Sequence, residues 1–224
     1  MKDYYIVSDV GGTRMRVAVF EAGEPVPCQH EVIPTHGGGE PPLDRLLGLI
    51  AKVHPTEGRL RAIALAAPGV LDPRTGYMYE APNVQGWIDL PIADILAKKF
   101  NAPALLGNDA NLAAMGEWQF GAGRGHHDLI YLTISTGIGG GVIMDDRLLL
   151  GSRGLATELG HITVDWDGPM CGCGQRGHLE AVASGPAMAN WVREQLQKGE
   201  ESILPLEPAP TARDSSWAEI GRAS

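Results

Sequence analysis

The chain contains the same pattern twice: a β-branched strand, a glycine-rich turn and a second strand. The first copy spans residues 4–20 (YYIVSDVGGTRMRVAVF) and turns at Gly11, Gly12 and Thr13. The second spans residues 128–144 (DLIYLTISTGIGGGVIM), with an expected turn over 136–141 and a short return strand over 142–144. Each pattern predicts a β-hairpin. The repetition indicates an internal duplication, with phosphate bound between the two halves.

The first turn carries residues suited to a phosphate and a metal ion. Asp9 ends the first strand, where a carboxylate can hold hydrated Mg²⁺. The backbone amides of the turn and the Thr13 hydroxyl can face a phosphate. The same D-x-G-G-T sequence is also simply a good hairpin turn, and by itself it does not decide between the two interpretations.

A second polar group stands where a short strand, expected over residues 104–106, meets a helix. Asn108, Asp109 and Asn111 lie at this junction. Such residues favour helix N-caps, which is their structural interpretation. Strand-to-helix junctions are also where α/β proteins bind ligands, so the same side chains can line a polar pocket.

Residues 154–185 (GLATELGHITVDWDGPMCGCGQRGHLEAVASG) concentrate the metal-binding residue types. They include Glu158, His161, Cys171, Cys173, His178 and Glu180. Thiolate and imidazole are the ligands that tetrahedral zinc prefers. The alternative is a pair of buried or redox-active thiols beside surface histidines. Because glycines surround the cysteines and few residues here can form a core, a bound metal would be what orders this loop.

The remaining pattern predicts an α/β chain. Periodicity predicts strands near residues 26–33 and over 61–66, a polar loop through residue 76, helices over 43–53, 91–100 and 186–198, and a linker over 199–216.

Composition excludes some functions. Acidic residues outnumber basic ones by 27 to 18, and no Lys/Arg cluster occurs, which argues against a nucleic-acid surface. No apolar run approaches the length of a membrane span, and the N-terminus lacks the pattern of a signal peptide. Three cysteines do not make a disulfide framework. We therefore expect a soluble, cytoplasmic protein with reduced thiols.

Taken in order, these motifs resemble the ROK family of sugar kinases and sugar-responsive regulators. The matching segments are DVGGTRMRVAVF, AAPGV, APN followed by Trp87, GNDAN, STGIGGG, GLATELGH and CGCGQRGHLE. The resemblance covers nearly everything up to about residue 198 and implies the actin/Hsp70/hexokinase-like (ribonuclease H-like) fold, with two lobes. We expect the first lobe over residues 1–107 and the start of the second over 108–198.

The resemblance also implies roles for individual residues. Asp109 would be the general base that takes the proton from a sugar hydroxyl. The sugar would be bound by Asn83, Asn108, Glu158, His161 and Glu180. The ATP phosphates and Mg²⁺ would be bound by Asp9, Gly11, Gly12, Thr13, Thr136, Gly137 and Gly139.

Two departures from the family pattern matter. The family's structural zinc site uses the histidine of ELGH and three cysteines, matching His161, Cys171 and Cys173, but this chain has His178 in place of the third cysteine. Imidazole also ligates zinc, so a site of two Cys and two His is expected. Family members also continue into a further helical segment and a glycine-rich motif that lies against the adenosine. We therefore expect a C-terminally truncated chain with an incomplete second lobe and a tail over 199–224.

The expected activity is ATP-dependent phosphorylation of the 6-hydroxyl of a hexose, with glucose favoured and N-acetylmannosamine or fructose as alternatives. The rival is a non-catalytic sugar-binding regulator or fragment. Family regulators usually carry an N-terminal DNA-binding helix-turn-helix, whereas the first strand here begins by residue 4, which favours the kinase. The resemblance also suggests a homodimer.

Overall fold

The computed structural model describes residues 1–201 of the chain. They form two compact units, one of Met1–Ile134 with Ile138–Ile162 and the other of Ser135–Gly137 with the chain from Thr163 onward. The lobe boundary expected after residue 107 stays a prediction. The tail expected over 199–224 lies, beyond residue 201, outside the described residues.

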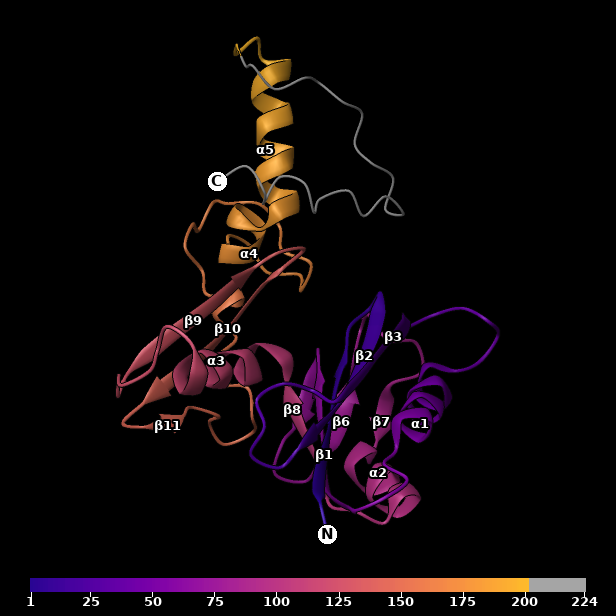
Figure 1. The fold of residues 1–224 in the computed structure, drawn as a ribbon. Coiled ribbons are helices and arrows are strands. Elements are labelled where there is room, and N and C mark those ends of the chain that lie inside the picture. The colour runs from indigo at the N-terminus through magenta and orange to yellow at the C-terminus, as the bar shows by residue number, and fades with distance from the viewer. Residues whose placement is uncertain (202–224) are drawn as a thin grey trace. The chain divides into compact units, whose positions relative to one another are not determined.

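A five-stranded mixed sheet with the order β3-β2-β1-β4-β8 forms the centre of the first unit (Figure 1). Its strands are β1 (Asp3–Val10), β2 (Arg14–Glu21), β3 (Gln29–Pro34), β4 (Arg59–Ala67) and β8 (Ala104–Asn108). The first three are antiparallel, and β4 and β8 run parallel to β1. The first predicted hairpin is therefore confirmed as β1 and β2.

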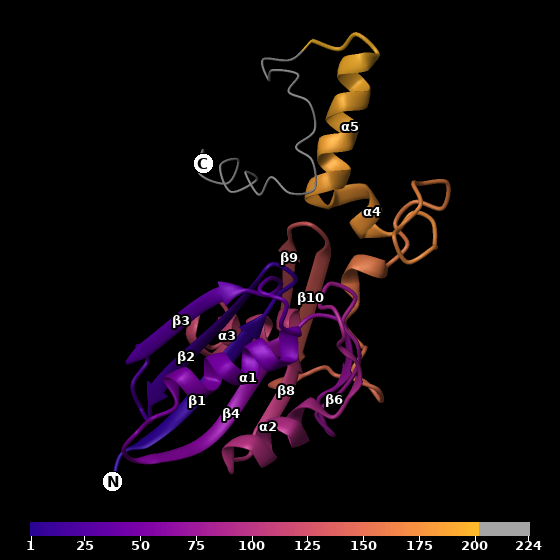
Figure 2. The same ribbon diagram turned by 90° about the vertical axis from the view of Figure 1, so that its right-hand side faces the viewer.

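Two helices, α1 (Pro42–Val53) and α2 (Ile92–Phe100), cover one face of this sheet (Figure 2). Alternate residues of β1 point to that face, so Ile6 and Val10 are fully buried whereas Tyr5 on the opposite face is 42% exposed. Leu46 and Ile50 of α1 are also fully buried. Both helices were predicted from the helical spacing of such apolar residues.

The prediction of a polar loop through residue 76 is wrong. The chain instead forms a small antiparallel sheet with the order β5-β6-β7, made of β5 (Val70–Asp72), β6 (Tyr77–Glu80) and β7 (Ile88–Leu90). These strands are too short to show a clear alternation of apolar and polar residues. Leu71, Met78 and Trp87 nevertheless join the core of the first unit.

The second predicted hairpin is present as β9 (Leu129–Ile134) and β10 (Ile138–Met144), which β11 (Arg147–Leu148) extends into a sheet. Helix α3 (Asp109–Phe120) packs against β9 and β10. Asp145 and Asp146 form the tight turn between β10 and β11, and they adopt positive φ angles of 49° and 61°.

The expected turn over residues 136–141 is wrong in extent, because β10 already begins at Ile138. Gly139, Gly140 and Gly141 therefore lie within a strand, where they serve packing. A Cβ atom on Gly141 would lie 2.5 Å from Cβ of Ala114 in α3, and one on Gly140 would lie 2.6 Å from Cδ1 of Leu159. The glycines let the helix and this leucine approach the strand backbone closely.

A buried hydrogen bond joins α3 to the segment that precedes the short 3₁₀ helix η1 (Leu159–His161). The Thr157 hydroxyl donates to Oδ1 of Asn111 at 2.8 Å, and each residue is only 5% exposed. The bond therefore fixes the backbone next to Glu158 relative to α3.

The second unit contains the helices α4 (Leu179–Ala183) and α5 (Gly185–Gln197), the latter confirming the helix predicted over 186–198. Ser184 caps α5 by accepting a hydrogen bond from the Ala187 amide, and the Gly185 amide donates to the Ser135 carbonyl at 2.9 Å. No helix within residues 1–201 has the length and apolar character that crossing a membrane requires.

Substituting Gly141 with alanine should destabilise the fold by about 1–3 kcal/mol, because the added methyl group overlaps Ala114. The matched control is Gly116→Ala in α3 itself, where an added Cβ meets nothing within 4 Å. That change should be neutral or stabilising by up to about 1 kcal/mol. Urea unfolding of both variants measures the difference, and equal midpoints would contradict the packing role.

Thr157→Val should cost about 1–3 kcal/mol of unfolding free energy, because it leaves the Asn111 side-chain oxygen buried without this donor. Thr56→Val, at an exposed loop position, should change the stability by less than about 0.5 kcal/mol. The same urea titration compares the two. A Thr157 variant as stable as the Thr56 control would show that the bond contributes nothing.

Candidate active site

The carboxyl ends of the parallel strands β1, β4 and β8 meet at one edge of the main sheet. Asp9 of β1 is in register with Ala66 of β4, and Ala67 of β4 is in register with Asn108 of β8. This edge of an open α/β sheet is where such folds bind ligands. The sheet thus brings Asp9 to the same edge as the junction predicted from the sequence.

Asp109 is the first residue of α3 and follows β8 directly. Although the residue is partly exposed, loss of water contact raises the pKa of its carboxyl, and the negative charge of Asp9 raises it further. The Ala110 amide donates to Oδ1 of Asp109 at 2.9 Å, which opposes the rise. A raised pKa is what a carboxylate needs in order to accept a proton effectively.

The two asparagines at this junction have local structural roles. Oδ1 of Asn108 accepts a hydrogen bond from the Asn111 amide at 3.1 Å and so caps α3. The N-cap interpretation therefore holds for Asn108, whose side-chain NH₂ group remains available as a donor. Asn111 is buried and accepts the hydrogen bond from Thr157, so it does not line a pocket.

The first glycine turn, Gly11–Thr13, lies directly against Asn83. A Cβ atom on Gly12 would lie 2.8 Å from Cβ of Asn83 and 3.1 Å from its carbonyl oxygen. Gly12 does not have a positive φ angle, so glycine is required here for space. The residue predicted to bind sugar is therefore in contact with the turn predicted to bind phosphate.

The second glycine turn, Ser135–Gly137, has a corresponding neighbour within the second unit. A Cβ atom on Gly137 would collide with Oε2 of Glu180. Oε1 of Glu180 in turn lies 3.9 Å from Sγ of Cys171. The carboxylate thus stands between this turn and the cysteine loop.

Glu158 is exposed and directly precedes η1, and His161 is the last residue of that helix. Thr157, the neighbour of Glu158, is held by its buried hydrogen bond to Asn111. Sequence reasoning missed Asn111 and Thr157 as a pair, because the residues lie far apart in the chain. It also missed Arg16, whose Nη1 is 2.6 Å from Oδ2 of Asp9 and so pairs with the carboxylate expected to hold Mg²⁺.

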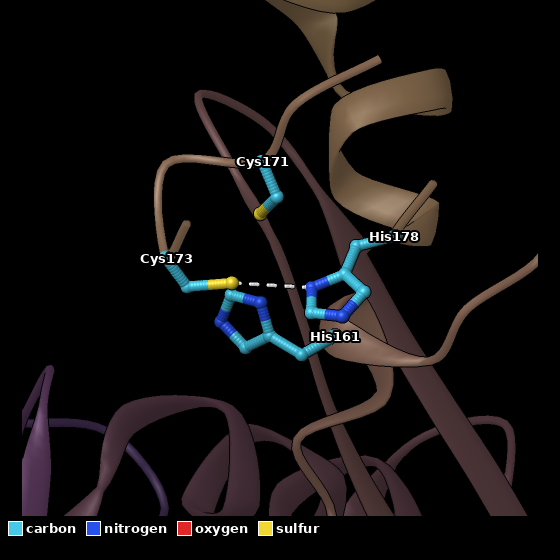
Figure 3. A group of neighbouring side chains, drawn as sticks. All are labelled: His161, Cys171, Cys173 and His178. Atoms are coloured by element: carbon cyan, nitrogen blue, oxygen red, sulfur yellow. Dashed lines mark hydrogen bonds between the residues drawn. The ribbon is translucent and has the colours of Figure 1, made fainter. Parts of the chain in front are cut away.

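The four predicted metal ligands come together, as Figure 3 shows. His161, Cys171, Cys173 and His178 each offer one ligand atom, and all four atoms lie within 4.8 Å of one another. Sγ of Cys173 is 3.2 Å from Nδ1 of His178. Burial raises the pKa of the Cys171 thiol.

This donor set fits a tetrahedral zinc ion. Zinc bonds of about 2.0–2.3 Å place neighbouring ligands roughly 3.3–3.8 Å apart, so a small contraction of the group would close it around one ion. Backbone hydrogen bonds shape the loop before any ion is considered: the Cys171 amide donates to the Gln175 carbonyl at 2.8 Å, and the Gly174 amide to the Cys171 carbonyl at 2.9 Å. Four protein ligands would leave no open position, which is typical of a structural site.

Comparison with known proteins assigns the chain to a family. The model of the ROK family matches residues 5–207. A glucokinase from Thermotoga maritima is 39% identical over 197 residues, which cover 88% of this chain and 62% of that protein. An N-acetylmannosamine kinase from Salmonella arizonae is 35% identical over 188 residues, covering 84% of this chain and 64% of that one.

A solved structure agrees with these sequence matches. The ROK family glucokinase from Streptomyces griseus in complex with glucose and AMPPNP superposes with a TM-score of 0.72 at 34% identity, covering 87% of this chain and 62% of that one. The chain thus spans less than two thirds of the length of these relatives. Its fold is the predicted actin/hexokinase-like fold. Because the family model matches most of its length, the chain belongs to the ROK family.

Proposed function

We propose that this chain carries the catalytic base and much of the substrate site of an ATP-dependent hexose kinase, most directly a glucokinase. The observation that carries the proposal is Asp109. It is a carboxylate at the carboxyl ends of the parallel strands, where loss of water contact and the negative charge of Asp9 raise its pKa. The similarity to a ROK glucokinase solved with glucose and AMPPNP supports the choice of sugar and nucleotide as substrates.

The proposed reaction is in-line phosphoryl transfer. Asp109 accepts the proton of the sugar 6-hydroxyl, the sugar oxygen forms a bond to the γ-phosphorus of ATP, and the bond from that phosphorus to the bridging oxygen breaks, releasing ADP. A primary hydroxyl is a poor nucleophile, so a carboxylate within hydrogen-bond reach is the main chemical contribution that the protein makes. Mg²⁺, when bound, neutralises charge on the phosphates.

The sugar would be held by Asn83, Asn108, Glu158, His161 and Glu180. Carboxylate and amide oxygens accept hydrogen bonds from hydroxyl groups, and the amide of Asn108 that does not cap α3 can donate one. These roles rest on the family resemblance and on the contacts of Asn83 and Glu180 with the two glycine turns.

The phosphates would lie at the glycine turns, against Gly11, Gly12, Thr13, Thr136 and Gly137. Asp9 would bind Mg²⁺ after giving up its ion pair with Arg16. Gly139 was predicted to join this group. Its place in β10 also gives it a packing role, since an added Cβ would lie 3.1 Å from that of Ala110.

We also propose that zinc binds His161, Cys171, Cys173 and His178 as a structural ion. It would order the loop that precedes Glu180 and hold His161 next to Glu158. Because both acidic residues are proposed sugar ligands, loss of the metal should weaken sugar binding.

The identity of the hexose is a separate part of the proposal. Glucose is favoured by the glucokinase relatives, and N-acetylmannosamine is the alternative that the relative from Salmonella arizonae supports. Fructose, a cytoplasmic location and a homodimer stay predictions from the family resemblance.

Asp109→Asn should lower kcat by about 10²–10⁴-fold, because the amide cannot accept the proton. An ADP-release assay with ATP, Mg²⁺ and a panel of glucose, N-acetylmannosamine, mannose and fructose measures this and selects the substrate. In the unmodified chain the rate should fall as the pH drops through the pKa of Asp109, which is raised above the ordinary value for an aspartate.

The matched control is Asp94→Asn, which removes an exposed carboxylate from α2 and should leave the rate unchanged. An Asp109 variant as active as this control would overturn the assignment of the base. Absence of turnover in the unmodified chain, together with a melting temperature that a sugar raises, would instead favour the rival function of sugar binding without catalysis.

Cys173→Ser should release the metal, since it removes one of two thiolate ligands, whereas Cys28→Ser should not, because Cys28 is an exposed cysteine outside the cluster. Elemental analysis of the purified chains should find about one zinc per molecule in the unmodified chain and in the Cys28 variant. Equal metal content in all three chains would show that Cys173 is not a ligand.

A further inference from the structure

The segment that follows β3 contacts both the first glycine turn and the loop over residues 81–87, which we call the Asn83 loop. Thr35 is fully buried, its hydroxyl donates to the Gly11 carbonyl, and its amide donates to the Thr13 carbonyl at 2.9 Å. The next residue, His36, places its ring Nε2 3.2 Å from the Asn83 carbonyl oxygen. Consecutive residues therefore hold the two parts of the proposed site.

The direction of the histidine hydrogen bond follows from its partner. A backbone carbonyl can only accept, so Nε2 of His36 carries the proton. Both the neutral tautomer protonated at Nε2 and the imidazolium satisfy this requirement.

Arg45 of α1 fixes this segment on its other side. Its Nη2 donates to the Pro34 carbonyl at 2.9 Å and its Nη1 to the Gly37 carbonyl at 3.0 Å. The backbone on both sides of Thr35 and His36 is thus attached to a helix of the core. His36 can therefore act as a fixed support for whatever it contacts.

The Asn83 loop, residues 81–87, is a compact unit closed by its own backbone. The Ala81 amide donates to the Trp87 carbonyl and the Val84 amide to the Ala81 carbonyl, both at 2.9 Å. Trp87 anchors the loop in the core, with no exposed surface. The tip at Asn83 is exposed, and from outside the loop it is contacted by Gly12 and His36.

We propose that His36 is a positioning residue that holds the Asn83 loop against the first glycine turn, so that the sugar-binding side chain keeps its place relative to the phosphates. This rests on the proposed function. His36 acts through the Asn83 backbone. Loss of its hydrogen bond should therefore affect the sugar more than the nucleotide, since Thr35 still holds the glycine turn.

The test compares three variants of the full chain: His36→Phe, which keeps a ring without a donor; His36→Gln, which keeps a donor; and His30→Phe, at an exposed position on β3. For His36→Phe, the KM for glucose should rise about fivefold to tenfold, the free-energy scale of one hydrogen bond, with the KM for ATP unchanged. His36→Gln should restore most of the sugar affinity, and His30→Phe should match the unmodified chain.

Amide hydrogen exchange gives a readout that does not need catalysis. The peptide over residues 81–87 should exchange faster in His36→Phe than in His36→Gln or His30→Phe. If the unmodified chain turns over none of the hexoses, the proposed kinase function fails and exchange alone tests the positioning role. Equal exchange in all chains, or a sugar KM for His36→Phe within about twofold of that for His36→Gln, would overturn the proposal.

Discussion

Each glycine turn contains one glycine that lacks the Cβ atom a larger residue would have, and this allows the turn to contact a residue proposed to bind substrate. Gly12 lies against Asn83 in the first unit, and Gly137 lies against Glu180 in the second. Neither glycine has a positive φ angle, so the demand at both positions is for space. Since phosphoryl transfer depends on holding the acceptor hydroxyl close to the phosphate, these contacts give the site a physical basis for positioning both substrates.

The position of Glu180 would also depend on a metal ion bound by the cysteine loop. Glu180 contacts the second turn through one carboxylate oxygen and approaches Cys171 through the other. A zinc ion bound at Cys171 and His178 would therefore fix the chain on both sides of the turns that lead to Glu180. If zinc binds here, His178 would supply an imidazole where the family resemblance implies a thiolate, so the ligands would carry one negative charge fewer.

Much of the fold was predictable because its signals are local. The strands of both hairpins and helices α1, α2 and α5 follow from residue spacing, and the Asn108–Asp109 junction follows from its place after a strand. The extent of β10 was not predictable in this way, since glycine is a weak strand former. Gly139–Gly141 pair with β9 and leave room for α3 and Leu159 against the strand, and both contacts come from distant parts of the chain. The strands β5, β6 and β7 were missed because each is too short for its residue pattern to distinguish a strand from a loop.

The residues that position the site were the least predictable, for a related reason. Asn111 and Thr157, or His36 and Asn83, are pairs joined by hydrogen bonds between distant parts of the chain, and no local pattern marks either partner. Their chemistry is ordinary, and only the fold makes them specific. Candidate catalytic and metal-binding residues can be recognised in a sequence by their type and spacing. The groups that hold them in place can be identified only from the tertiary structure, which shows which backbone each side chain supports.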